Sequence, residues 1–299
     1  MKLLIEKLMS AYKVSGGKMD QHFLIHEPTI EQIVLEADLE RDDVVLEIGG
    51  GLGNLSEKIA PLVKKLYIVE KDEKLAKIME ERLLKEREEG DLSDIFSGLG
   101  FKNVEIIKGD VTKIDLSEIP FNKIVANLPY SISSEITVEI LKHKFDVAIL
   151  MYQYEFAKRL AAEPNGKDYG RISVLTQYKA DPEILFKVPS EYFSPAPKVD
   201  SAVIKIKPKE KSEVFLESEE YFFEVTKAIF GQRRKKVKNS IAHNKMILNI
   251  SDIKNLFGGL CPEVYEEYKI SKMIEKRAEN LDIEDIAILS NYLYKLKNV

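Results

Sequence analysis

Residues 43–53 read Asp-Val-Val-Leu-Glu-Ile-Gly-Gly-Gly-Leu-Gly, and this stretch decides the fold. A short apolar run that ends in glycines is typical of a buried parallel strand followed by a turn. Asn54 is predicted to cap the helix that follows, in which Leu55, Ile59 and Val63 share one face. The stretch therefore predicts strand, glycine loop and helix, the opening unit of an α/β sheet.

The spacing of these glycines limits the kind of ligand that the loop binds. The pattern is Glu47-x-Gly49-x-Gly51-x-Gly53, whereas a dinucleotide fingerprint requires glycine at the position of Asn54. Glycine still lets the backbone approach a ligand closely, because it has no Cβ atom. The helix N-terminus therefore need not meet a pyrophosphate.

An acidic residue follows each of the next two predicted strands. Glu70 ends the run 66–69, ~20 residues past the glycines, where a carboxylate can accept hydrogen bonds from both hydroxyls of a ribose. Asp110 follows the run 104–107 and can accept from the exocyclic amine of an adenine. Since the carboxyl ends of parallel strands share one edge of the sheet, these residues predict a nucleoside site.

The fourth strand, 123–126, leads into Asn127-Leu128-Pro129-Tyr130. An exocyclic amine of a nucleobase is a poor nucleophile, and the Asn127 amide oxygen and the Leu128 carbonyl could accept from its two N–H groups. Pro129 would fix the turn, and Tyr130 offers a flat ring on which a base could stack. Taken alone, the tetrapeptide also fits an Asn-x-Pro turn with a packed tyrosine.

Three more apolar runs complete a predicted sheet of seven strands. They are 147–151, 184–188 and 202–206, with helices expected at 154–162 and 172–179. Tyr192–Asp200 is a proline-rich, aromatic and basic loop that would reach the same sheet edge. Near the N-terminus, Pro28 suits the first turn of a helix that runs to about Ala37. Gly90–Gly100 is predicted to be a loop.

The pattern changes after Pro208. A charged linker is followed, from Tyr221 onward, by helical periodicity with a break at Gly258-Gly259. We therefore predict two domains, residues 1–208 with the α/β sheet and residues 209–299 as a smaller all-helical domain.

Composition narrows the class of protein. Of the 299 residues, 32% are charged and 44% hydrophobic, which is typical of a globular chain, and no apolar run approaches the ~18 residues of a membrane span. The early charges at the N-terminus argue against a secretory signal, so we expect a cytoplasmic protein. The single cysteine, Cys261, and four dispersed histidines predict no disulfide and no metal site.

Charge distribution bears on a nucleic-acid partner. The net charge of −5 argues weakly against one, yet residues 231–246 hold six Lys and Arg with no acidic residue. A second run, 198–211, holds five lysines against Asp200 and Glu210. Each run fits an RNA-binding surface or a solvated face equally well.

Taken in order, the motifs resemble those of the adenosine dimethyltransferases of small-subunit ribosomal RNA, the family of the bacterial kasugamycin-sensitivity methylase and its archaeal and eukaryotic counterparts. The resemblance starts near Ser15 and reaches the C-terminus. It is carried by Gln21–Leu24, Glu47–Gly53, Glu70, Gly109–Val111, Asn127–Tyr130, Phe193–Ser201, Gln232–Lys236 and Arg277–Leu281. The sequence reads closer to the archaeal and eukaryotic branch, since Asp20 and His22 stand where the bacterial pattern usually has glycine and asparagine.

The resemblance implies a class I S-adenosylmethionine-dependent methyltransferase with a Rossmann-like sheet in the first domain and RNA binding in the second. It implies that His22 and Leu24 close over the cofactor, Gly49 meets its methionine part, Glu70 its ribose, Asp110 its adenine, and Asn127 both cofactor and target amine. It further implies a catalytic segment Asn127, Leu128, Pro129 and Tyr130, a second stacking ring from Phe193, and RNA contacts from Arg233, Arg234, Lys235 and Lys236.

The implied reaction is dimethylation of the N6 amines of two adjacent adenosines near the 3′ end of small-subunit RNA, in a pre-30S particle, by a monomer. Two rivals stay open. One is a macrolide-resistance methylase of large-subunit RNA, which shares the catalytic motifs. The other is a ribosome-assembly binding factor in which catalysis is secondary. A small-molecule methyltransferase would not need the basic C-terminal region.

Overall fold

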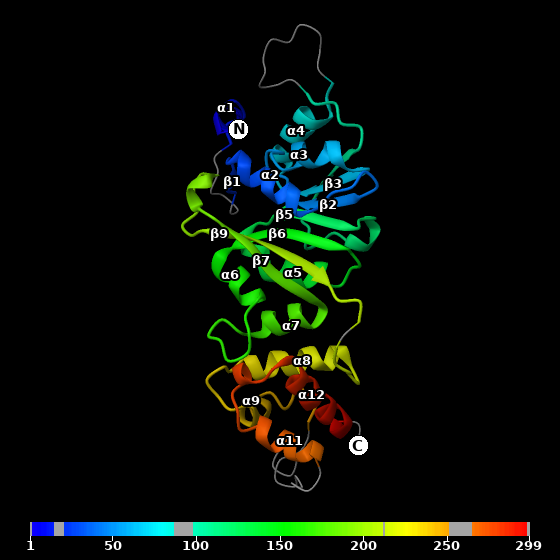
Figure 1. Ribbon diagram of the computed structural model, residues 1–299, viewed down its shortest axis with the longest axis vertical. Coiled ribbons are helices and arrows are strands. Elements are labelled where there is room, and N and C mark those ends of the chain that lie inside the picture. The colour runs from blue at the N-terminus through cyan, green and yellow to red at the C-terminus, as the bar shows by residue number, and fades with distance from the viewer. Residues whose placement is uncertain (1, 15–20, 87–97, 212, 251–264, 298–299) are drawn as a thin grey trace. The chain divides into compact units, whose positions relative to one another are not determined.

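Figure 1 shows the computed structural model of the protein, which describes residues 2–14, 21–86, 98–211, 213–250 and 265–297. Asp20, most of the Gly90–Gly100 loop, the Gly258-Gly259 break and Cys261 lie outside these ranges, so the expectations for them stay predictions. By its internal contacts the chain divides into two compact units. The first comprises residues 1–157 and 180–208, and the second residues 158–179 and 209–299.

A sheet of seven strands forms the centre of the first unit, as predicted, in the order β4-β3-β2-β5-β6-β9-β7. The strands are β2 Val44–Ile48, β3 Lys65–Glu70, β4 Val104–Lys108, β5 Lys123–Asn127, β6 Val147–Gln153, β7 Ala180–Val188 and β9 Ser201–Pro208. The first five strands are parallel, and β9 runs antiparallel between β6 and β7. The strand order reverses beside β2, which pairs with both β3 and β5, so this edge has the crevice where open α/β sheets bind ligands.

Burial on both faces explains why these strands are continuous apolar runs. Val45, Leu46, Ile124, Val125 and Ile149 are all fully buried. A parallel sheet requires such burial, because crossover helices cover both of its faces.

Helices of the first unit connect and cover these strands. They are α1 Lys2–Ala11, α2 Glu27–Glu36, α3 Ser56–Ile59, α4 Glu73–Met79 and α5 Ser133–Ile140, with short helical turns at Ala60–Leu62, Glu80–Leu84 (η3), Leu116–Glu118, Tyr130–Ile132 (η5) and Ser190–Tyr192. Pro28 lies in the first turn of α2, as predicted.

A second, two-stranded sheet joins parts of the chain that are far apart in sequence. In it β1 Phe23–Leu24 pairs antiparallel with β8 Phe193–Ser194. The Ile25 amide extends the pairing by donating to the Tyr192 carbonyl at 2.8 Å. The N-terminal motif and the proline-rich loop therefore lie side by side, which periodicity alone did not predict.

The second unit is helical, with helices α7 Arg171–Lys179, α8 Glu219–Phe230, α9 Val237–His243, α11 Tyr265–Met273 and α12 Ile283–Lys297 and the turn Ala278–Asn280. Helix α6 Tyr154–Leu160 runs across the division between the units. The contacts place residues 158–179 in this unit, although the sequence pattern groups them with the sheet. The reason is packing: Tyr169 and Val174 are fully buried in one core with Phe222, Val225 and Ile229.

Candidate functional site

A cavity of about 260 Å³ lies at the carboxyl ends of β2, β3, β4 and β5. Nearly all the predicted site residues of the first unit line it, namely His22, Leu24, Gly49, Glu70, Asp110, Asn127, Leu128, Pro129 and Tyr130. Phe193 is the exception, because it is not among the lining residues. The residues that follow β2, β3, β4 and β5 therefore line one cavity, as the strand-end argument predicts.

Gly49 allows the glycine loop to touch the Asn127–Tyr130 segment. Its φ of +77° is in the region that L side chains rarely adopt, and a Cβ atom there would lie 3.3 Å from the Pro129 Cδ and 3.6 Å from the Asn127 carbonyl oxygen. The Gly49 amide is held by the Val69 carbonyl at 2.8 Å. Only glycine fits this approach without strain.

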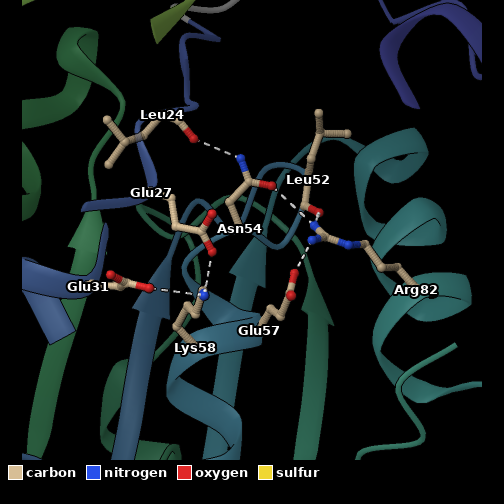
Figure 2. Close-up of polar contacts among 8 residues, drawn as sticks. All are labelled: Leu24, Glu27, Glu31, Leu52, Asn54, Glu57, Lys58 and Arg82. Carbon is tan, nitrogen blue, oxygen red and sulfur yellow. Dashed lines mark hydrogen bonds and ion pairs between the residues drawn. The ribbon is translucent and has the colours of Figure 1, made fainter. Parts of the chain in front are cut away.

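Asn54 joins the glycine loop to the N-terminal segment (Figure 2). Its amide nitrogen donates to the Leu24 carbonyl at 2.8 Å, and its amide oxygen accepts from Arg82 at 3.1 Å. The predicted cap is therefore wrong: Leu55 is the N-cap of α3, and no side chain caps this helix. The buried Asn54 amide finds its partners in tertiary contacts instead.

Arg82, in η3, holds the outer side of the same loop. Its side chain is 8% exposed, and its guanidinium donates to the Leu52 carbonyl and pairs with Glu57 in addition to its bond with Asn54. Sequence reasoning missed this residue, since it lies within a run of charged residues that reads as a solvated helix face. The glycine loop is thus supported by a buried cation as well as by its own backbone.

Glu70 is 7% exposed, and each of its carboxylate oxygens already accepts one backbone amide. The donors are Gly51 at 3.0 Å and Asp72 at 2.9 Å. Burial raises the pKa of Glu70, and these amides partly oppose the shift. Because each oxygen keeps a further lone pair, the carboxylate can still accept two hydroxyl groups.

Asp110 is an ionised acceptor at the end of β4. Lys71 lies 2.8 Å from one carboxylate oxygen, and the amide and hydroxyl of Thr112 donate to the other at 3.1 and 2.8 Å. The bond from Lys71 is the largest cause of a pKa lowered to about 2, and the bonds from Thr112 come next. Lys71 is well exposed, so it can move aside for a ligand donor.

Glu47 is a cavity residue for which the sequence pattern supplied no role. It is 1% exposed and accepts a hydrogen bond from the Ser56 hydroxyl at 2.6 Å. Burial raises its pKa to about 8, and the neighbouring Glu70 charge adds to the shift. A cationic group bound beside Glu47 would favour the carboxylate form.

The Asn127–Tyr130 segment presents acceptors and a ring to the cavity. The Asn127 amide nitrogen donates to the His22 carbonyl at 3.3 Å, which leaves the amide oxygen as the acceptor. Within the described residues, no donor bonds the Leu128 carbonyl. The Tyr130 hydroxyl is 2.6 Å from the Ser201 hydroxyl, so β9 fixes one end of the ring.

His22, and not Phe193, provides the ring that faces Tyr130. The two ring centroids are 6.0 Å apart and the planes differ by 22°. His22 Nδ1 lies 2.8 Å from the Pro195 carbonyl oxygen. Phe193, which pairs with Leu24 in the two-stranded sheet, is 3% exposed and packs in the hydrophobic core of the first unit, so the structure does not bring its ring to the cavity.

The basic cluster in the second unit splits into two kinds of residue. Arg233 donates to the Lys167 and Tyr169 carbonyls at 2.9 and 2.8 Å, and Lys236 pairs with Glu275 at 2.8 Å. Arg234 and Lys235 are exposed and make no ion pair within the described residues.

The motif that contains this cluster, Gln232–Lys236, is joined to the second C-terminal motif, Arg277–Leu281. Lys236 and Arg277 form a β-bridge, and the Val237 amide donates to the Lys276 carbonyl at 2.8 Å. Gln232–Lys236 and Arg277–Leu281 therefore make up one surface.

In the part of the chain that the structure describes, no helix is long and apolar enough to cross a membrane. Among the same residues, no three His, Cys, Asp or Glu side chains lie together in a way that could hold a metal ion.

Comparison with known proteins identifies the family. The family described as ribosomal RNA adenine dimethylase matches residues 17–256. A relative from Methanococcoides burtonii, named probable ribosomal RNA small subunit methyltransferase A, is 42% identical over 99% of both chains. A crystal structure of a dimethyladenosine transferase from Plasmodium falciparum aligns with a TM-score of 0.72 and 28% identity, over 93% of this chain and 99% of that one.

The 23S ribosomal RNA methyltransferase ErmE has the same fold, with a TM-score of 0.62 at 24% identity over 91% of this chain and 99% of that one. The two alignments cover more than nine tenths of this chain and, with its mostly parallel sheet and its helical C-terminal part, confirm the predicted class I methyltransferase sheet with a helical domain. The chain belongs to the ribosomal RNA adenine dimethylase family.

Proposed function

We propose that this protein transfers methyl groups from S-adenosylmethionine to the N6 amines of two adjacent adenosines near the 3′ end of small-subunit ribosomal RNA, twice at each amine. One observation carries the proposal: the Asn127–Tyr130 segment opens into the same cavity as Glu70 and Asp110. That cavity thus combines acceptors for an amine with acceptors for a nucleoside. The names of the archaeal relatives support small-subunit RNA as the substrate.

The lining residues fit the cofactor. Glu70 would accept the ribose hydroxyls and Asp110 the adenine amine, while the loop at Gly49 allows close approach of the methionine part. The segment with His22 and Leu24 would cover it, held by Asn54. Bound there, S-adenosylmethionine supplies a methyl group that its sulfonium already activates.

The residues at the end of β5 would act on the target amine. The Asn127 amide oxygen and the Leu128 carbonyl accept from its two N–H groups, which holds the nitrogen in line with the methyl group. Tyr130 stacks on the base. Stacking worth about 1–3 kcal/mol offsets part of the few kcal/mol needed to take a base out of its stack.

RNA recognition would rest on the second unit. Arg234 and Lys235 have side chains available for phosphates, whereas Arg233 and Lys236 would act mainly by shaping the surface. We expect a monomer that works in the cytoplasm on a pre-30S particle. This assignment also gives residues 209–299, together with 158–179, the role of an RNA-binding domain.

The rival functions receive less support. The likeness to the large-subunit methylase is below 25% identity and concerns the fold alone, while relatives at about 42% identity are named for the small subunit. A binding factor with secondary catalysis would not need Asn127, Glu70 and Asp110 together in one cavity.

The deciding experiment incubates the protein with labelled S-adenosylmethionine and either undermethylated small-subunit particles or bare large-subunit RNA. Mass spectrometry then maps dimethyladenosine. We expect two adjacent dimethyladenosines near the 3′ end of the small-subunit RNA only. Label in the large-subunit RNA would favour the resistance methylase, and particle binding without transfer would favour the assembly factor.

A further inference from the structure

We propose that His22 is a catalytic residue whose Nε2 atom takes the proton that the target amine releases during methyl transfer. The inference rests on the proposed function and goes beyond it, because the resemblance implies only that the segment with His22 and Leu24 closes over the cofactor. Three observations support it: the hydrogen bond of His22 Nδ1, the residues that neighbour His22, and the hydrogen bonds that the other titratable groups in the cavity already make.

Hydrogen bonding determines the tautomer of the neutral ring. Nδ1 lies 2.8 Å from the Pro195 carbonyl oxygen, and a carbonyl can only accept. Nδ1 therefore carries the hydrogen atom, and Nε2 is left with a lone pair that points away from Pro195. Within the described part of the chain, nothing bonds Nε2.

The neighbours of His22 are the residues proposed to hold the amine and the base. Its carbonyl accepts the Asn127 amide nitrogen at 3.3 Å, so the segment that carries the imidazole is tied to the amine-binding side chain. Its ring lies nearly parallel to the Tyr130 ring, with the centroids 6.0 Å apart. The imidazole thus lines the same cavity as the residues proposed to hold the amine and the base.

Methyl transfer creates the need for a proton acceptor. The N6 lone pair forms the new N–C bond as the S–C bond breaks, and the pair of that bond stays on sulfur. The nitrogen then carries a positive charge and one proton too many. One of its two protons leaves its hydrogen bond to Asn127 or Leu128 and passes to Nε2, the imidazolium returns it to water, and the neutral N6-methyl amine has a lone pair for the second transfer.

The other titratable groups that line the cavity already have hydrogen-bond or ion-pair partners within the protein. Asp110 pairs with Lys71, Glu47 accepts from Ser56, Glu70 accepts two backbone amides, Asp72 accepts from Gln21 at 2.9 Å, and the Tyr130 hydroxyl bonds Ser201. Each carboxylate that lines the described cavity therefore accepts at least one hydrogen bond, whereas no donor bonds His22 Nε2 in the part of the chain that the structure describes.

Two variants separate proton transfer from simple stacking. His22→Phe keeps a flat ring opposite Tyr130 but has no nitrogen, and His22→Asn keeps a polar group near Pro195 but has neither ring nor base. The matched control is His26→Asn, because His26 bonds Thr29, stacks on Tyr192 and does not line the cavity. Circular dichroism and calorimetric S-adenosylmethionine affinity establish that each variant folds and binds cofactor.

The measured quantity is the single-turnover rate of methyl transfer to small-subunit particles between pH 5.5 and 8.5. We expect the wild-type rate to fall toward low pH, since protonated imidazole cannot accept a proton. Both His22 variants should be slower by roughly 100-fold or more near pH 7.5 and should lose this pH dependence, while the His26 control keeps it. If His22→Phe retains the wild-type rate and profile, stacking is the role of His22 and the proposal fails.

A readout without catalysis tests the same idea. Nitrogen-15 NMR of the full-length protein should show His22 with hydrogen on Nδ1 and a bare Nε2. The opposite tautomer would overturn the proposal whatever the rates. If wild-type protein transfers no methyl group at all, the proposed function has failed. If it transfers normally and the His22 variants match its rate and pH profile, the proposed function stands and the proposal for His22 has failed.

Discussion

At the scale of single residues, the Asn127 side chain has two roles: its amide nitrogen makes a hydrogen bond within the protein, and its amide oxygen is the proposed acceptor for the target amine. The amide nitrogen donates to the His22 carbonyl, and Asn127 lines the cavity, where its amide oxygen is available as an acceptor. Replacement by alanine would remove both, whereas the strand that carries it is fixed by its pairing with β2 and β6.

Asn127→Ala should therefore reduce methyl transfer by about 100-fold or more while the protein stays folded, because one positioned hydrogen bond at a reacting centre contributes on this scale. Tritium transfer to small-subunit particles measures the rate, and circular dichroism monitors the fold. Turnover near the wild-type rate would remove Asn127 from the proposed mechanism.

Glu47 makes stability depend on pH. Its pKa rises from 4.5 to about 8 in the folded protein, so between these values the folded state holds a proton that the unfolded chain has lost. The free energy of unfolding should thus decrease as pH rises across this window, by up to ~1.4 kcal/mol per pH unit. Glu70, whose pKa is also raised, contributes with the same sign.

Glu47→Gln should flatten this dependence, since glutamine keeps an acceptor for Ser56 and cannot ionise. Urea unfolding at pH 5.5, 6.5 and 7.5 measures the effect, with wild-type protein alongside. An equal decline in both proteins would show that the buried carboxyl does not set the pH response.

At the scale of elements, the glycine loop is packed from below as well as from the ligand side. A Cβ atom on Gly50 would lie 2.5 Å from Ile68 Cγ2 and 2.6 Å from Met79 Sδ. Both neighbours are fully buried, so neither can move without disturbing β3 or α4.

Gly50→Ala should destabilise the protein by about 1–3 kcal/mol, the usual cost of overpacking a core. Gly170→Ala is the matched control, because no atom lies within 4 Å of its Cβ position. Thermal melting compares the two variants. Equal melting temperatures would contradict the packing described for Gly50.

Arg82, in η3, and Lys58, in α3, offer a comparison of a buried and a surface cation (Figure 2). Arg82 is 8% exposed and bonds the Leu52 carbonyl, while Lys58 is 28% exposed and pairs with Glu27 and Glu31 on the surface. Removing a buried cation leaves its buried partners without a hydrogen bond or counter-charge, which costs much stability. Removing a surface cation costs little, because water already screens its ion pairs.

Arg82→Met should therefore cost about 3 kcal/mol of stability and weaken cofactor binding through the loosened loop. Lys58→Met should cost less than ~1 kcal/mol and leave cofactor binding unchanged. Chemical unfolding and calorimetric titration with S-adenosylmethionine measure both effects. The prediction is wrong if the two variants behave alike.

At the scale of the whole molecule, the net charge does not show which basic residues are available to RNA, because some of them are bound to other groups of the protein. Arg233 joins the 158–179 segment to the C-terminal helices within the second unit, whereas Arg234 and Lys235 extend from the same turn. One basic run thus contains a structural residue and two candidate phosphate contacts.

Arg234→Gln combined with Lys235→Gln should weaken RNA binding and reduce the slope of log affinity against log salt by about 1.5, since each phosphate contact contributes ~0.7–0.9. Filter binding across a salt series measures the slope. Arg233→Gln should instead lower the melting temperature, through its lost bonds to the Lys167 and Tyr169 carbonyls. An unchanged slope in the double variant would mean that its residues form only a solvated face.

The sequence by itself determined the strands, their carboxyl ends and the ligand-facing residues that follow them. Gly49, Glu70, Asp110 and Asn127 could be placed in one site because each directly follows an apolar run, and parallel strands bring such positions together. These predictions depend on local pattern and on a general rule of sheet topology, so no distant contact was needed.

Only the tertiary structure decided which distant side chains meet. The pairing of β1 with β8 buried Phe193 and brought His22 opposite Tyr130, and a buried Arg82 turned Asn54 from a helix cap into a link with Leu24. Burial, hydrogen bonding and ion pairing depend on neighbours far along the chain, whereas periodicity records only whether a position faces the core. For that reason the sequence identified the positions that line the cavity, and the tertiary structure determined which side chains contact one another there.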